Sequence, residues 1–274
     1  MEAFSEELRV ASALATAAGR LAFSMRRPGL LVDRKAANEP VTAADRAASD
    51  LIMAGLQTAF PDDIPISEEA PDDRRRLDPA RRVWFIDPID GTQDFIDGGP
   101  GFASMIGLCV GGRPRLGAVY QPTTDRLYYG GPGLGAWVTE AGTTWPIHCA
   151  DTHEITAMRL VASKSHPSKR VAAIKAAMGI TQEHTVGSVG VKVALIASGE
   201  QDLYVSASTR TKAWDTCGPE AIILAAGGRF TNIWGKPLQY ADDSLNHTDG
   251  LMASNGPLHD MIVDRLRHLL PAHL

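Results

Sequence analysis

The chain has 274 residues, of which 44% are hydrophobic and 22% charged, and it carries a net charge of −5 with a pI of about 5.9. This balance is typical of a globular protein of one large or two moderate domains, and it argues against a nucleic-acid polymer or an anionic membrane as the partner. An acidic protein that binds phosphate would have to use metal ions or a few local cations.

The cysteines and the apolar segments indicate a reducing compartment. Cys109, Cys149 and Cys217 are odd in number and widely spaced, which favours free thiols over a disulfide framework or a zinc site. No apolar run approaches the roughly 20 residues that span a bilayer. The first residues also lack the basic start and apolar core of a signal peptide. We therefore expect a cytoplasmic protein without a membrane span.

Two helices are predicted near the N-terminus. Apolar residues recur at helical spacing over residues 5–26, and a second helix is expected over residues 42–60 with Thr42 as its N-cap. Residues 62–82 are polar and rich in proline and charge, so we expect a surface connection there. The Asp-Asp-Arg-Arg-Arg run at residues 72–76 is typical of a solvated face.

The most informative segment follows this connection. Residues 83–86 form an apolar run suited to a buried strand, and the run ends at Asp87, with Asp90, Gly91 and Thr92 directly after it. Mg²⁺ prefers oxygen ligands and usually binds through one or two carboxylates plus a substrate phosphate. Backbone N–H groups of a Gly-Thr pair at a helix start suit such a phosphate. On this segment alone, an ordinary turn with capping, solvated aspartates remains an alternative.

The rest of the chain shows two different patterns of predicted secondary structure. Short strands separated by glycine, at 104–110, 116–120, 127–129 and 136–138, predict an antiparallel sheet flanked by the N-terminal helices. Beyond residue 150, strands at 159–162 and 203–206 alternate with helices at 168–178, 187–197 and 215–226. Gly227 is expected to cap the last helix in a left-handed conformation. We predict the α/β class, with an α+β domain over residues 1–150 and an α/β domain over residues 151–274.

Four scattered features accompany the aspartate segment, and each has an ordinary explanation. Glu68-Glu69 can be a solvated loop, and Thr42 with Asp45 is close to a capping box. An aspartate after Trp214 favourably opposes a helix dipole. His166 and Lys192, each beside a serine, can be surface or capping residues.

Taken together, these features resemble the inositol monophosphatase superfamily. The matching motifs come in the family's order between residues 35 and 240: Thr42-x-x-Asp45, Glu68-Glu69, Asp87-Pro-Ile-Asp-Gly-Thr92, Trp214-Asp215 and Gly227-Gly228. The resemblance implies an alternating αβαβα sandwich with a metal site between its two halves. It also implies a lithium-sensitive, Mg²⁺-dependent phosphomonoesterase, in which Mn²⁺ can substitute.

The resemblance further implies roles for individual residues. Glu68, Asp87 and the Ile89 carbonyl would hold a first Mg²⁺, and Asp87, Asp90 and Asp215 a second, with room for a third near Asp45. Asp45 and Thr92, together with Glu68, would be catalytic: the pair would orient and deprotonate the attacking water. Asp215 and the N–H groups of Gly91 and Thr92 would contact the substrate.

The resemblance is strongest to the 3'(2'),5'-bisphosphate nucleotidase branch. Residues 212–220 look like the nucleotidase version of this helix start, and the segments around Ser163, His166, Ser188 and Lys192 are similar to those that hold the nucleotide. The stretch before Trp214 carries Ser206, Ser208 and Thr209 instead of the glutamate that an inositol monophosphatase usually places there.

We therefore expect a small phosphorylated substrate, foremost adenosine 3',5'-bisphosphate. An inositol-1-monophosphatase or related sugar-phosphate phosphatase, a histidinol-phosphatase and a catalytically silent phosphate-binding module remain alternatives, and self-association into a homodimer stays open.

Overall fold

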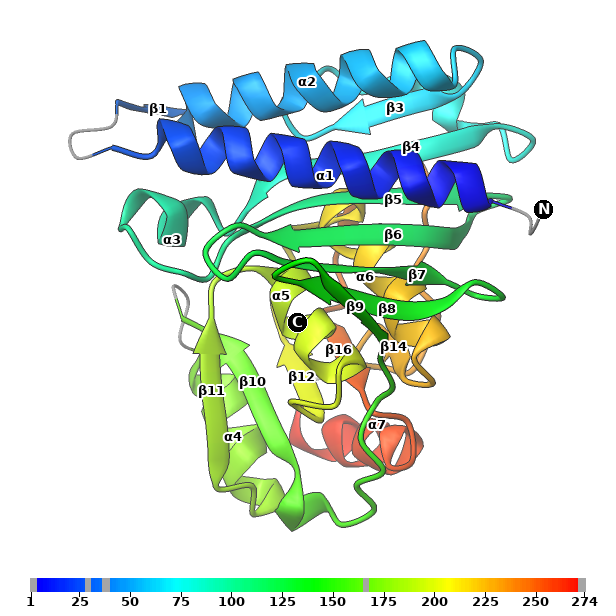
Figure 1. The fold of residues 1–274 in the computed structure, drawn as a ribbon. Coiled ribbons are helices and arrows are strands. Elements are labelled where there is room, and N and C mark those ends of the chain that lie inside the picture. The colour runs from blue at the N-terminus through cyan, green and yellow to red at the C-terminus, as the bar shows by residue number, and fades with distance from the viewer. Residues whose placement is uncertain (1–3, 28–30, 36–39, 165–167, 271–274) are drawn as a thin grey trace.

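The computed structural model describes residues 4–27, 31–35, 40–164 and 168–270, and it has five layers in which helices and sheets alternate (Figure 1). Two N-terminal helices cover one face of a seven-stranded sheet. Two further helices lie between that sheet and a five-stranded sheet. A third pair of helices covers the outer face of the five-stranded sheet. This is the αβαβα arrangement that the resemblance implied. No helix in the described part of the chain is both long and apolar enough to cross a membrane.

The outer layer consists of helices α1 (Ser5–Met25) and α2 (Ala43–Ala59). Both helices bury small residues, because alanines spaced along α1 and α2 face each other and the sheet. The predicted N-cap is confirmed, since the side chain of Thr42 accepts the N–H of Ala44 at 3.1 Å. A short hairpin of β1 (Val32–Arg34) and β2 (Pro40–Thr42) leads into α2.

The seven-stranded sheet has its strands in chain order, and only its first pair is parallel. The four predicted hairpin strands and the predicted strand before Asp87 are confirmed, and the first and last strands of the sheet were not predicted. The strands are β3 (Ile64–Ser67), β4 (Arg82–Asp90), β5 (Ala103–Val110), β6 (Arg113–Gln121), β7 (Arg126–Gly131), β8 (Gly135–Glu140) and β9 (Thr143–Pro146).

The expectation of a surface connection over residues 62–82 is wrong at its start. Ile64 and Ile66 are buried, and β3 pairs with β4 at the edge of the sheet. Side chains two residues apart on a strand face the same side, so an Ile-x-Ile pair is enough to anchor an edge strand. Proline between the two isoleucines and the surrounding charges hid this signal.

The five-stranded sheet is mixed, with strand order β11-β10-β12-β16-β14. Strand β10 is parallel to both neighbours, whereas β16 is antiparallel to both of its own. The strands are β10 (Arg159–Ser163), β11 (Gln182–Val186), β12 (Leu203–Ser206), β14 (Arg229–Thr231) and β16 (Leu251–Ser254).

The remaining helices complete the layers. They are α3 (Thr92–Ile96), α4 (Lys169–Met178), α5 (Val189–Ala197), α6 (Ala213–Ala225) and α7 (His259–Leu269). Helices α5 and α6 share one apolar core with both sheets, and α4 and α7 share another with the outer face of the five-stranded sheet. Gly227 follows α6 with a φ of 89°, as predicted. A second short pair, β13 (Thr211–Lys212) with β15 (Asn246–His247), lies at the start of α6.

Candidate metal centre

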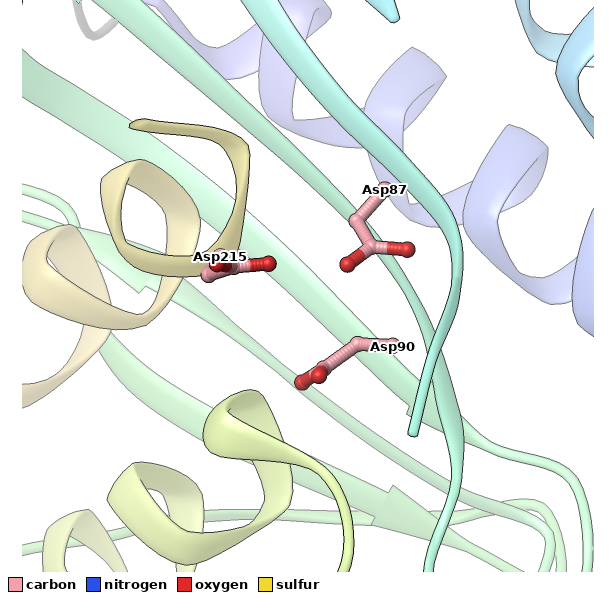
Figure 2. Close-up of side chains that lie close together, drawn as sticks. All are labelled: Asp87, Asp90 and Asp215. Atoms are coloured by element: carbon pink, nitrogen blue, oxygen red, sulfur yellow. The ribbon is translucent and has the colours of Figure 1, made fainter. Parts of the chain in front are cut away.

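The end of strand β4 carries two aspartates that an irregularity turns to one side. Pairing with β5 joins Asp87 to Met105 and Asp90 to Ala103, so β4 has one residue more than its partner. Pro88 lies in this bulge, where its missing N–H costs no ladder hydrogen bond. In a regular strand, residues three apart face opposite sides. The extra residue removes that alternation, and both carboxylates point into one space (Figure 2).

Helix α5 orients Asp90 through its first turn. Oδ2 of Asp90 accepts the hydroxyl of Ser188 at 2.5 Å and the N–H of Gly190 at 2.7 Å. Ser188 is the N-cap of α5, and its Oγ accepts the N–H of Val191 at 3.0 Å. Because Ser188 is fully buried, its placement favours a role in holding Asp90 over the predicted contact with substrate.

Asp215, in the first turn of α6, completes a group of three carboxylates with Asp87 and Asp90. One carboxylate oxygen from each of Asp87, Asp90 and Asp215 lies within 4.8 Å of the others (Figure 2). Oδ2 of Asp215 also accepts the N–H of Lys212 at 2.6 Å, which fixes its side chain against the helix start. An all-oxygen donor set of this kind suits a hard divalent cation such as Mg²⁺.

The electrostatics of the cluster call for a cation. Burial, followed by the charges of Glu68, Asp90 and Asp215, raises the pKa of Asp87. Burial and the neighbouring acids raise the pKa of Asp215 to about 8. Burial also raises the pKa of Asp90, although Lys192 opposes that shift. Three adjacent carboxylates therefore stay fully ionised at neutral pH only when positive charge neutralises them.

Lys192 supplies part of that charge from inside the protein. Its side chain is 1% exposed, and Nζ donates to the carbonyls of Val186 at 3.2 Å and Gly187 at 2.7 Å. Burial lowers the pKa of Lys192 to about 8, against the pull of Asp90 and Asp215. An ammonium group so enclosed is a counter-charge for the aspartates. This placement does not favour the predicted contact between Lys192 and a substrate phosphate.

Glu68 lies directly after β3, beside the cluster but outside the group of three. Its N–H donates to the Ile86 carbonyl at 3.1 Å, which extends the parallel pairing with β4. The Glu68 carboxylate is 3.0 Å from Nζ of Lys35, and that lysine also binds Glu69. Lys35 was not predicted, because a single lysine in a loop carries no signal in the sequence. Lys35 engages only Oε1 of Glu68, so the other carboxylate oxygen can still face a metal.

Asp45 and Thr92 were predicted to act as a pair, and each has a different partner here. Oδ2 of Asp45 accepts both the N–H of Thr42 at 2.8 Å and the Thr42 hydroxyl at 2.6 Å. The Thr92 hydroxyl donates to the Ile89 carbonyl at 3.1 Å. Burial, together with the charge of Glu68, raises the pKa of Asp45. No hydrogen bond joins Asp45 to Thr92 within the described residues.

Gly91 begins the segment that was predicted to contact the substrate. With a φ of 91°, this residue is in the left-handed region, and a Cβ there would lie 2.8 Å from the Gly101 carbonyl oxygen. Ser163 ends β10, one residue before Lys164, and His166 lies outside the described residues. Lys164 is 46% exposed and contacts the buried Asp94 of α3 at 2.6 Å. Lys164 was not predicted as a site residue, although it lies in the segment from Ser163 to His166 that was singled out.

Comparison with known proteins supports this assembly. A family model described as the inositol monophosphatase family matches residues 4–269. The 3'(2'),5'-bisphosphate nucleotidase CysQ of Escherichia coli (strain K12) is 37% identical over 206 residues, which are 75% of this chain and 81% of that protein.

Solved structures agree with that match. CysQ from Bacteroides thetaiotaomicron aligns with a TM-score of 0.77 at 27% identity, over 92% of this chain and 98% of that one. An inositol monophosphatase from Anabaena (Nostoc) sp. PCC 7120 aligns with a TM-score of 0.77 at 26% identity, over 98% of both chains. Sequence, fold and carboxylate cluster thus agree, and the chain belongs to the inositol monophosphatase family.

Proposed function

We propose that the protein is a Mg²⁺-dependent phosphomonoesterase that hydrolyses adenosine 3',5'-bisphosphate to AMP and phosphate. The observation that carries the proposal is the convergence of Asp87, Asp90 and Asp215, which come from two distant parts of the chain. Family membership supports the hydrolase class, and the similarity to CysQ supports the substrate.

The ligand set combines the observed group of three aspartates with the roles that the family resemblance implies. Asp87, Asp90 and Asp215 would hold one Mg²⁺, and Glu68 with the Ile89 carbonyl would join Asp87 around another. The Ile89 oxygen has a second lone pair beside the one that accepts the Thr92 hydroxyl. When bound, Mg²⁺ neutralises the charge of the phosphate ester and lowers the pKa of the attacking water.

The chain's own residues would orient that water and the ester. Oδ1 of Asp45 is free of the two hydrogen bonds that engage Oδ2, so it can accept a proton from water. Thr92 would position the same water through its hydroxyl. The first N–H groups of a helix have no partner within the helix, and those of Gly91 and Thr92 would bind the phosphate oxygens. Such positioning and charge neutralisation are the main devices of phosphoryl-transfer enzymes.

Lys164 is our candidate for the residue that binds the phosphate that is not hydrolysed. A bisphosphate needs a cation for its second phosphate, and Lys164 is half-exposed, whereas Lys192 is enclosed. Asp94 links Lys164 to α3, directly after the proposed phosphate-binding turn. The stretch before Trp214, which carries Ser206, Ser208 and Thr209, contains no acidic residue, and this argues against inositol phosphate as the substrate.

A substrate panel tests the proposal. With Mg²⁺ present, we expect kcat/KM to be highest for adenosine 3',5'-bisphosphate, ahead of inositol 1-phosphate and histidinol phosphate. A preference for inositol 1-phosphate would instead assign the activity of the alternative branch. Failure to release phosphate from any of the three would support a silent binding module.

A matched pair of variants tests the second phosphate. Lys164→Met should raise KM for adenosine 3',5'-bisphosphate about tenfold or more and leave KM for adenosine 3'-monophosphate nearly unchanged, because a charge-assisted contact to phosphate contributes about 1.5–3 kcal/mol in general. Lys236→Met, at an exposed position on another loop, should change neither. Equal effects of Lys164→Met on both substrates would remove Lys164 from this role.

A further inference from the structure

One arginine of the charged run at residues 72–76 is buried, contrary to the solvated face predicted for the whole run. The side chain of Arg76 is 1% exposed, whereas that of its neighbour Arg75 is 71% exposed and forms an ion pair with Asp73. Burial of a guanidinium is costly unless its donors are satisfied. The contacts of Arg76 therefore carry a constraint that the sequence pattern does not reveal.

Arg76 joins two segments that are about 170 residues apart in the chain. Its Nε and Nη2 donate to the two carboxylate oxygens of Asp72, at 2.6 and 3.0 Å. Nη1 donates to the Asp242 carbonyl at 2.6 Å, and Nη2 also donates to the Asp243 carbonyl at 3.0 Å. The planar fork of donors thus fixes the main-chain path of residues 242–243 instead of a side chain.

The segment that Arg76 fixes encloses the first turn of α6. The Leu245 carbonyl accepts the N–H of Ala213 at 2.8 Å, and β15 pairs with β13 immediately before the helix. On the other side of the turn, Oγ1 of Thr216 is 2.8 Å from Nε2 of His247 and 3.1 Å from the Tyr240 hydroxyl. Asp215 lies between Ala213 and Thr216, so both of its flanks are held by residues 240–247.

We propose that Arg76 is a positioning residue for the metal centre, acting through residues 242–247 on Asp215. Arg76 lies in the connection between β3, which precedes Glu68, and β4, which ends in Asp87 and Asp90. It therefore ties the part of the chain that supplies those acids to the part that supplies Asp215. The inference rests on the proposed function, because it takes Asp215 as a metal ligand. Residues that orient metal ligands commonly change metal affinity about 10–100-fold when they are replaced.

Titration of the metal-free protein with Mn²⁺, followed by calorimetry, tests this role without relying on activity. Arg76→Met should weaken Mn²⁺ binding about tenfold or more. The matched control Arg75→Met, one residue away and exposed, should bind Mn²⁺ within about twofold of the unchanged protein. Arg76→Lys keeps the positive charge but loses the planar fork of donors. Its Mn²⁺ affinity should therefore lie between those of Arg76→Met and Arg75→Met.

The outcomes separate this inference from the proposed function. If the unchanged protein does not bind Mn²⁺, the proposed metal centre fails, and the role of Arg76 fails with it. If the unchanged protein binds Mn²⁺ and Arg76→Met binds equally well, only the role of Arg76 is overturned, even if the variant melts at a lower temperature. Should Arg76→Met not fold, Asp72→Asn loosens the same guanidinium, and an unchanged affinity in that variant would equally overturn the inference.

Discussion

The first turns of α2 and α6 have the same local construction but face different surroundings. Each carries an aspartate at its third residue, and each aspartate accepts the N–H of the residue before the helix, at 2.8 Å for Asp45 and 2.6 Å for Asp215. Both arrangements satisfy a helix N–H and oppose the helix dipole. Local sequence thus orients both carboxylates in a similar way.

The difference lies in what surrounds the two turns. Asp45 accepts both the N–H and the hydroxyl of Thr42, and α2 packs against α1 and the sheet through Ala44, Ala48, Ile52 and Leu56. Asp215 faces Asp87 and Asp90, and residues 240–247 hold its turn from both sides. A helix cap therefore orients a carboxylate, but tertiary packing determines whether that carboxylate meets others in one cluster.

Replacement of Asp215 should give the largest effect. Asp215→Asn keeps the shape of the side chain but removes a charge from the cluster, so we expect kcat to fall about 10³-fold, at the upper end for losing one electrostatic contact to a transition state. Steady-state phosphate release at saturating Mg²⁺ measures this. Asp264→Asn, at an exposed ion pair with Arg267, is the control. Near-normal kcat in Asp215→Asn would contradict the ligand assignment.

Asp45→Asn should have a smaller effect on activity and little effect on metal binding at the three-carboxylate cluster. Its amide oxygen can still accept the N–H of Thr42, so the cap remains, but the proton acceptor is lost. We expect kcat to fall about 10²-fold, within the range for general-base catalysis. Mn²⁺ titration alongside the kinetics separates the two aspartates. A loss of Mn²⁺ affinity as large as that of Asp215→Asn would place Asp45 among the ligands of the cluster.

Stability of the metal-free protein should fall as the pH rises from about 6.5 to about 7.5. The folded-state pKa of Asp215 is raised to about 8, from about 3.9 in an unfolded chain. Within that window the folded protein holds a proton that the unfolded chain has released. The free energy of unfolding should therefore drop by about 1 kcal/mol per pH unit.

Other titrating groups limit the choice of window. His247 and His259, whose pKa values burial lowers to about 4, act with the opposite sign, but chiefly below the window. Lys192, lowered to about 8, also acts with the opposite sign, mainly above the window. Urea unfolding in EDTA at several pH values measures the slope. Asp215→Asn should flatten the slope. A remainder is expected from Glu220, whose pKa is raised to about 7, and from Asp87 and Asp90, whose pKa values burial also raises. An unchanged slope would contradict the assignment.

The smallest expected effect concerns the caps themselves. Thr42 caps α2 with its side chain, which accepts the N–H of Ala44. At the start of α6, Lys212 contributes its backbone N–H, which donates to Asp215. Thr42→Ala should lower the free energy of unfolding by about 1 kcal/mol, and Lys212→Ala should change it by less than about 0.5 kcal/mol. Urea denaturation measures both. Equal losses would show that the two turns depend on their side chains to the same extent.

Local sequence determined much of this protein. Apolar periodicity predicted α1 and α2, alternating short runs predicted the central strands of the large sheet, and Gly227 marked the end of α6. The motifs around Asp87 and Asp215, taken together with Thr42-x-x-Asp45, Glu68-Glu69 and Gly227-Gly228, indicated the family. These signals are local, because a cap, a strand or a helix stripe depends on residues only a few positions apart.

The tertiary structure decided what the residues face. The bulge that turns Asp87 and Asp90 to one side depends on pairing with β5, and the enclosure of Lys192 depends on the packing of α5 between two sheets. Arg76 is buried because residues 242–243 meet it from the far end of the chain. A charged side chain looks the same in a sequence whether it faces water or two carbonyls. Only the packing of distant segments removes the water, and that removal gives these charges their roles.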